Sequence, residues 1–165
     1  MPLIRRATSA DLEATGELWV ESARAAFTPL LPAAHSIPDP QPERLRARLA
    51  DRTVTVLVAE GDGELGGFTA CGESRDPDPE PGVGEVQSFF VAAGRWRAGI
   101  GRELMPAALD DLRERGYSEA TVWSFDANDR ANAFYEAHGF VRDGTERREE
   151  VWANLLEVRY RRRLA

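Results

Sequence analysis

The chain has 165 residues, 42% of them hydrophobic, a single cysteine and a formal net charge of −7 at pH 7. This length suits one core, so we expect a single domain over residues 1–165, and the negative charge gives no electrostatic support to a nucleic-acid partner. The single cysteine excludes an internal disulfide, no apolar run approaches a membrane span, and the N-terminus lacks the apolar core of a signal peptide, so we expect no membrane partner and a cytoplasmic location.

Apolar periodicity and turn residues predict a series of short strands and helices. In chain order we expect a strand at 3–7, a helix from 8–11 to 26, a proline-rich irregular segment at 27–41, a helix at 42–50, strands at 53–60 and 65–73 around a turn at 61–63, a loop at 75–84, a strand at 85–91, a helix at 101–116, a strand at 119–125, a helix at 128–138, and closing strands at 140–142 and 155–162.

The connections between these elements predict the fold class. The hairpin-linked middle strands should be antiparallel, whereas the strand–helix–strand unit over 85–125 should pair in parallel through a right-handed crossover. We therefore expect an α/β protein with a mixed, largely antiparallel sheet and helices on both faces.

A strand, a glycine-containing turn and a helix start follow one another at residues 89–104. Gly99 and Gly101 have no side chain to keep an anion from the backbone, and glycine takes positive φ readily. The uncovered amides of a helix N-terminus favour phosphate, and Arg97 and Arg102 can add charge-assisted hydrogen bonds. The segment predicts a site for a phosphorylated cofactor, although a glycine pair of this kind also occurs in ordinary tight turns.

Three segments together resemble the GNAT superfamily of acetyl-CoA-dependent N-acetyltransferases. They are the opening strand and helix start at 4–12, the segment from Phe89-Phe90-Val91 through the glycine loop to Leu104, and the late helix with its following residues at 128–140. Trp96 departs from the family pattern, which often has Gln or Arg there, and we expect it to pack on the sheet. The resemblance implies acetyl-CoA as co-substrate and a GNAT-like sheet in which two parallel strands splay apart around the thioester.

The resemblance also implies how acetyl-CoA is held. The pantetheine arm would pair with main-chain groups of Phe89, Phe90 and Val91, as an added strand does. The remaining predicted cofactor contacts are Arg97, Ala98, Gly99, Ile100, Gly101 and Arg102 around the pyrophosphate, and Asn128 and Asn132 on the opposite side.

Acetyl transfer to an amine requires a base, because a free alkylammonium has a pKa near ~10. It also requires a donor for the thioester oxygen and a proton for the departing thiolate. By the resemblance, Tyr135 is the predicted acid, the N–H of Val91 the donor and Glu85 the base, with Glu73 or a water chain as alternatives. No residue cluster has the spacing of a metal site, so no metal is expected.

The leading prediction is an enzyme that transfers acetyl directly to a small-molecule primary amine. A second hypothesis is an acyl-CoA-binding sensor without chemistry. A third is an acetyltransferase for protein N-termini, which would need an open groove between the proline-rich segment and the last strands, whereas a closed tunnel would argue for a small acceptor. The identity of the acceptor is not predicted, and a homodimer is left open because dimers are common in the family.

Overall fold

The computed structural model describes residues 1–39 and 41–165; Pro40, one of the prolines of the expected irregular segment, lies outside the described residues. The chain forms a seven-stranded sheet in the order β1-β2-β3-β4-β5-β7-β6. Its strands are β1 (Leu3–Arg6), β2 (Val54–Gly61), β3 (Glu64–Glu73), β4 (Val83–Val91), β5 (Glu119–Phe125), β6 (Val141–Arg148) and β7 (Leu156–Arg163). The helices are α1 (Leu12–Phe27), α2 (Pro42–Ala50), α3 (Ile100–Glu114) and α4 (Asp129–Ala137).

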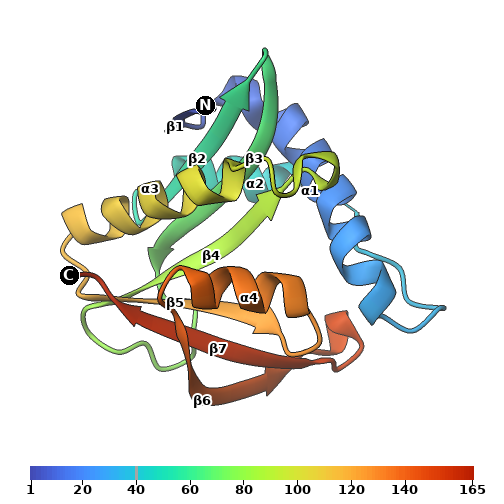
Figure 1. Ribbon diagram of the computed structural model, residues 1–165, viewed down its shortest axis with the longest axis vertical. Coiled ribbons are helices and arrows are strands. Elements are labelled where there is room, and N and C mark those ends of the chain that lie inside the picture. Colours follow the sequence, from blue (N-terminus) through green and yellow to red (C-terminus); the bar gives the residue numbers. More distant parts are fainter. Residues whose placement is uncertain (40) are drawn as a thin grey trace.

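The helices cover both faces of the sheet. Figure 1 shows α3 and α4 on one face and α1 and α2 on the other. Among the strands of the described residues, only β4 and β5 pair in parallel; the other neighbouring strands are antiparallel. The predicted mixed sheet is confirmed, and its parallel pair is the one expected from the crossover through α3.

The core under α3 forms because apolar residues recur every fourth position along the helix. Ile100, Leu104, Ala108 and Leu112 are all buried, as the spacing predicts. Burying a side chain such as Leu contributes about 1.5–3 kcal/mol, so this face is enough to hold α3 on the sheet. The N-terminus of the helix is thereby fixed beside the end of β4.

The parallel strands separate half-way along their length. Their pairing ends at Val86 and Val122, and the register between β3 and β4 shifts so that Gln87 has no partner. A β-bulge of this kind bends its strand. Beyond the bulge β4 follows β3, whereas the rest of β5 pairs only with β7, which confirms the expected splay.

Two strand boundaries differ from the prediction by more than one residue. β4 begins at Val83, two residues early, and β6 extends to Arg148 instead of ending at 142. β6 is an edge strand whose residues are charged, polar or glycine after Val141, and Gly144 has a φ of 89° beside a register shift. Such a strand has no alternation of apolar residues, so its sequence pattern does not reveal it.

The loop between β3 and β4 is held against β7. Asp76 pairs with Arg159 at 2.8 Å and accepts a hydrogen bond from the indole of Trp123, and Glu80 pairs with Arg161 at 2.8 Å. This loop brings Arg75 to the face of the sheet that α1 and α2 cover. Within the described residues, no helix has both the length and the apolar character needed to cross a membrane.

Candidate active site

The backbone between β4 and α3 forms a concave set of amides. Arg97 and Gly99 have φ values of 67° and 89°, and α3 begins at the next residue, Ile100. The N–H groups of Arg97, Gly99, Ile100, Gly101 and Arg102 donate no hydrogen bond within the described part of the chain. Free amides at a helix N-terminus after left-handed residues form an anion-binding concavity.

The side chains of the loop complement this concavity. Arg97 and Arg102 are exposed and form no ion pair with any side chain that the structure describes. The indole of Trp96 donates to the carbonyl oxygen of Val91 at 2.9 Å, and the Arg130 guanidinium lies 3.1 Å from the centroid of its ring. Trp96 thus packs back on the end of β4, as expected, and leaves Arg97 free to meet an anion.

The two glycines have different roles. Gly99 uses the positive φ that glycine permits, whereas Gly101 lies inside α3 with helical backbone. A Cβ at Gly101 would lie 3.0 Å from Cε2 of Phe134. Gly101 is therefore needed for the close approach of α3 to α4.

The free edge of β4 faces the gap left by the splay. Ala92 donates its N–H to Gly66 on the β3 side, and the direction of main-chain groups alternates along a strand. Phe90 therefore shares the direction of Ala92 and pairs with Phe68, while the N–H groups of Phe89 and Val91 point into the gap. Of the three residues predicted to meet the pantetheine arm, Phe89 and Val91 have the required main-chain direction and Phe90 does not.

Tyr135 lies where the two strands part. It is 7% exposed and belongs to the same buried cluster as Val86 and Val122, the last paired residues of β4 and β5. Burial raises the pKa of its phenol. The preceding residue, Phe134, is half-buried and packs against Phe89. Tyr135 is thus a protonated phenol at physiological pH.

The two predicted asparagines lie at the start of α4. Asn128 is its N-cap, and its Oδ1 accepts from the N–H of Ala131 at 3.3 Å. Asn132 is buried, accepts from the Ser124 hydroxyl at 2.7 Å and donates to two main-chain carbonyl groups. Its amide therefore joins α4 to the end of β5, while Asn128 is half-buried at the helix start.

Glu85 is 1% exposed and is engaged by a residue that the sequence did not single out. The N–H of Arg75 donates to Oε2 of Glu85 at 2.7 Å, and its guanidinium donates twice to Oε1, at 2.8 and 3.2 Å. Both carboxylate oxygens of Glu85 are therefore occupied. Glu73, the alternative base, is exposed at the end of β3.

Four aromatic rings gather on the face covered by α1, at the separated ends of β4 and β5. The ring centroid of Phe27 lies 6.1 Å from Phe90, 5.0 Å from Phe125 and 5.5 Å from Trp152. We call these four residues the aromatic cluster. Phe27, Phe90 and Trp152 are half-buried, so the cluster keeps accessible ring surface. No local sequence pattern reveals this cluster, because its members come from α1, β4, β5 and the segment before β7.

The proline-rich segment reaches the same region. The Nε2 atom of His35 lies 2.8 Å from the carbonyl oxygen of Val151, one residue before Trp152 of the aromatic cluster. This contact joins the segment after α1 to the turn between β6 and β7. It spans the place where an acceptor groove between these segments would be open.

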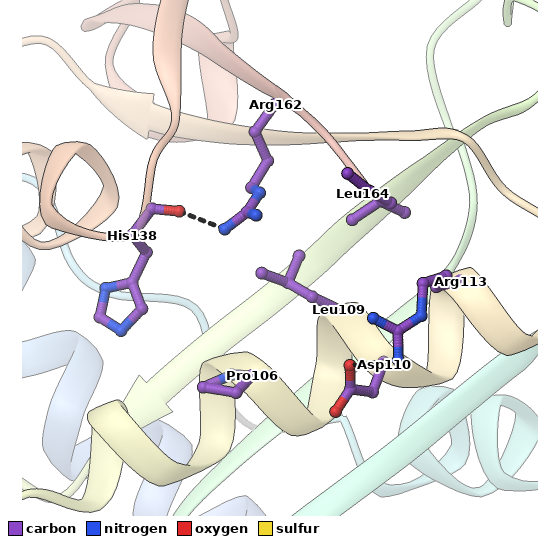
Figure 2. Close-up of a pocket in the computed structure, with 8 residues that line it drawn as sticks. Pro106, Leu109, Asp110, Arg113, His138, Arg162 and Leu164 are labelled. Atoms are coloured by element: carbon purple, nitrogen blue, oxygen red, sulfur yellow. Dashed lines mark hydrogen bonds and ion pairs between the residues drawn. The ribbon is translucent and has the colours of Figure 1, made fainter.

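A separate small cavity lies away from these residues. Figure 2 shows it between α3, the end of α4 and the C-terminal residues, next to the hydrogen bond from Arg162 to the carbonyl of His138. Its volume of about 160 Å³ is below the 300–1,000 Å³ usual for ligand pockets. It contains none of the predicted site residues.

Comparison with known proteins decides the family. Residues 17–140 match the model of the acetyltransferase (GNAT) family. The chain belongs to this family. An uncharacterized N-acetyltransferase of Archaeoglobus fulgidus is 34% identical over 140 residues, which cover 84% of this chain and 92% of that protein.

Solved structures of other acetyltransferases share the GNAT fold. The ribosomal-protein-alanine N-acetyltransferase of Brucella melitensis is 25% identical with a TM-score of 0.81, over 98% of this chain and 99% of that chain. The PaiA N-acetyltransferase of Thermoplasma acidophilum, solved with coenzyme A, is 18% identical with a TM-score of 0.77, over 96% and 98%. The predicted family, GNAT-like fold and class of enzyme are thus confirmed.

The arrangement in this GNAT acetyltransferase is suited to group transfer at the gap between β4 and β5. Free amides at the start of α3 lie at the end of β4, and the N–H of Val91 points into the gap. Tyr135 lies at the base of the gap on the side of α4, and the aromatic cluster lies on the side of α1. A phosphorylated ligand and a second, smaller molecule can therefore approach from opposite faces of the sheet.

Proposed function

We propose that residues 1–165 form one N-acetyltransferase domain that transfers an acetyl group from acetyl-CoA to a primary amine by direct attack. The observation that carries this proposal is the set of amides at Arg97 and at residues 99–102, which have no partner within the described residues and lie beside the gap between β4 and β5. The similarity to a coenzyme A complex supports the choice of ligand. Acetyl-CoA supplies an activated acetyl group as its thioester.

Different residues around the gap would bind different parts of acetyl-CoA. The amides of Gly99, Ile100 and Gly101, with the guanidinium groups of Arg97 and Arg102, would bind the pyrophosphate. Ala98 is exposed, and its small side chain leaves the amides accessible to the pyrophosphate. Main-chain groups of Phe89 and Val91 would pair with the pantetheine arm. Asn128 at the start of α4 remains a proposed contact, whereas the amide of Asn132 is already used within the protein.

The chemical step would place one donor and one acid at the reacting bond. The N–H of Val91 would donate to the thioester oxygen as this oxygen gains negative charge. The amine nitrogen forms the new C–N bond as the C–S bond breaks, and the sulfur takes the proton of the Tyr135 hydroxyl. Burial raises the pKa of Tyr135, which keeps that proton available. The buried Cys71, with its pKa raised to about 12, is a poor nucleophile, which favours direct transfer.

Acetyl transfer also needs a base that takes the proton of the amine. Glu85 is one candidate for this base, but it can accept a proton only if it gives up hydrogen bonds from Arg75.

The second candidate for the acceptor is a protein N-terminus, which the similarity to a ribosomal-protein-alanine N-acetyltransferase favours. The contact of His35 with Val151 favours the small amine.

Replacing the acid tests the proposal. We expect Tyr135→Phe to lower kcat about 100-fold, the usual contribution of a general acid, and to leave the dissociation constant of acetyl-CoA unchanged. The measurements are release of free thiol with an amine panel and calorimetric titration with acetyl-CoA. The matched control is Tyr160→Phe, which removes a hydroxyl from the same buried cluster, where it bonds to Arg142. Equal losses of turnover and of affinity in Tyr135→Phe would contradict the role of an acid.

A further inference from the structure

Glu157 is a buried carboxylate on the face of the sheet where the acceptor would bind. It lies on β7 and is paired directly with Phe125 of β5, so the two side chains share a face. Glu157 is 5% exposed, and its Oε1 accepts from Nη2 of Arg147 at 3.1 Å. Its Oε2 is buried and accepts no hydrogen bond from any residue that the structure describes, and Nε of Arg147, in the same ion pair, is a buried donor that is likewise without a hydrogen-bond partner there.

An unpaired, buried carboxylate oxygen indicates a missing donor. Leaving such an oxygen without a partner is costly, and charged groups are the most costly case. Most buried polar atoms in folded proteins are paired, so an exception calls for a ligand, a water molecule or a catalytic role. A primary ammonium group, with three N–H donors and a positive charge, matches what Oε2 lacks.

The two buried carboxylates, Glu85 and Glu157, differ in how many of their oxygens accept hydrogen bonds. Arg75 occupies both oxygens of Glu85 with three hydrogen bonds, whereas Glu157 has one oxygen left over. Burial raises the pKa of Glu157, which makes it a better proton acceptor than an ordinary carboxylate. The charged groups that face it are Arg147 on β6, Glu149 in the following turn, and Arg75 in the loop before β4.

The neighbours of Glu157 indicate what the amine carries. Phe125 lies opposite Glu157, and its ring contacts Phe27 and Trp152 at centroid distances of 5.0 and 5.7 Å. Ring surface of this kind favours an apolar or aromatic arm on the acceptor. The contact between His35 and Val151 links the two segments that border this region, which favours a small acceptor over an extended chain.

We propose that the acceptor is a small primary amine with an apolar or aromatic arm, whose ammonium group binds Oε2 of Glu157 and whose arm packs on the aromatic cluster. This inference rests on the proposed acetyl transfer and adds its substrate class and its base.

The proton balance of the step follows from this placement. An N–H bond of the ammonium breaks and an O–H bond forms at Oε2 of Glu157, which leaves a neutral amine. That amine forms the C–N bond as the C–S bond breaks, and the sulfur takes the proton of Tyr135. The nitrogen loses a second proton as it becomes an amide, and this proton goes to the phenolate of Tyr135, which becomes a phenol again. Glu157 then releases its proton to water, so one proton is released per turnover.

A binding experiment tests the substrate class and the carboxylate together. The protein is first titrated with coenzyme A, and the complex is then titrated with 2-phenylethylamine, with putrescine and with an alanine-initiated tetrapeptide. We expect 2-phenylethylamine to bind most tightly. Glu157→Gln should weaken its binding about 10- to 100-fold, the effect of losing one charge-assisted hydrogen bond, and leave coenzyme A affinity unchanged. The matched control is Glu149→Gln, which also disturbs Arg147 but leaves Oε2 of Glu157 in place.

Activity and folding measurements complete the test. In Glu157→Gln the acidic limb of the pH profile of kcat/KM should disappear, and Glu157→Asp should restore part of the amine affinity. Thermal melts identify any variant that does not fold. If Glu157→Gln does not fold, the amine affinity of Glu157→Asp tests the inference in its place. Tighter binding of the tetrapeptide, or unchanged amine affinity in Glu157→Gln, would overturn the inference and leave the proposed function standing. If the wild-type protein does not bind coenzyme A, both this inference and the proposed function are contradicted.

Discussion

At the scale of single residues, neighbours decide what an ionisable side chain can do. Glu85 and Glu157 are both buried glutamates on one face of the sheet, yet Arg75 satisfies only the first of them. Arg48 shows the same principle for a cation: burial lowers its pKa to about 10, and it donates to the side chains of Gln87 and Ser88. Residue type alone therefore does not separate a base from a structural ion pair.

Cys71 gives a prediction at this scale. Its thiol is fully buried, and burial raises its pKa to about 12, so almost no thiolate exists at pH 8. We expect the folded protein to resist alkylation by iodoacetamide at pH 8 and to be labelled fully in denaturant. Mass spectrometry after timed labelling measures this. Rapid labelling of the folded protein would mean that β3 opens far more readily than its buried position indicates.

At the scale of elements, a bulge and a helix start create the candidate site. The bulge at Gln87 turns β4 away from β5, and the side chain of Gln87 is held by Arg48 and donates to the carbonyl of Glu73. Gly99 then allows α3 to begin immediately after a left-handed turn. Both features are local departures from regular structure, and together they leave main-chain groups free at one place.

The left-handed turn at Gly99 gives the next prediction. An alanine at φ 89° is strained by about 1–2 kcal/mol, although a Cβ there would meet no atom within 4 Å. We expect Gly99→Ala to lower the melting temperature and to weaken coenzyme A binding up to about tenfold, because the loop relieves the strain by turning amides away. Gly94→Ala is the control, since Gly94 lies in the same loop without positive φ or close neighbours. Equal effects of the two substitutions would argue against the role of the turn.

At the scale of the whole molecule, ion pairs between arginine and carboxylates join distant segments. Arg5 joins β1 to the start of α1 through Asp11, and Arg161 on β7 binds both Glu80 and Glu119. Hydrogen bonds from Arg5 lower the pKa of Asp11 to about 2, and those from Arg161 lower the pKa values of Glu80 and Glu119. Folded carboxylates with lowered pKa values stabilise the protein at neutral pH, and protonating them removes that stability.

These shifts predict how stability depends on pH. As the pH falls from about 4 to about 2, the folded state loses the contribution of Asp11, so the melting temperature should drop. Above about pH 9, it should drop again, because Cys71, Tyr117 and Tyr135 have raised pKa values and the unfolded chain releases their protons first. Circular dichroism melts from pH 2 to 11 measure both limbs. Asp11→Asn should flatten the acid limb, and a melting temperature that rises below pH 4 would contradict the assignment.

The sequence by itself determined the order of elements and the glycine turn before α3, because periodicity, glycines and helix starts act over a few neighbouring residues. The resemblance of three segments gave the family, which the family match confirms. Gly99 lies in the turn before α3, as the local pattern predicted, and Tyr135 lies in α4, within the segment that carries the resemblance. Only the tertiary structure decided which buried glutamate keeps a free oxygen, and that Phe27, Phe125 and Trp152 share one surface. These properties depend on side chains from distant segments meeting at the divergence of β4 and β5, and no local pattern encodes that meeting.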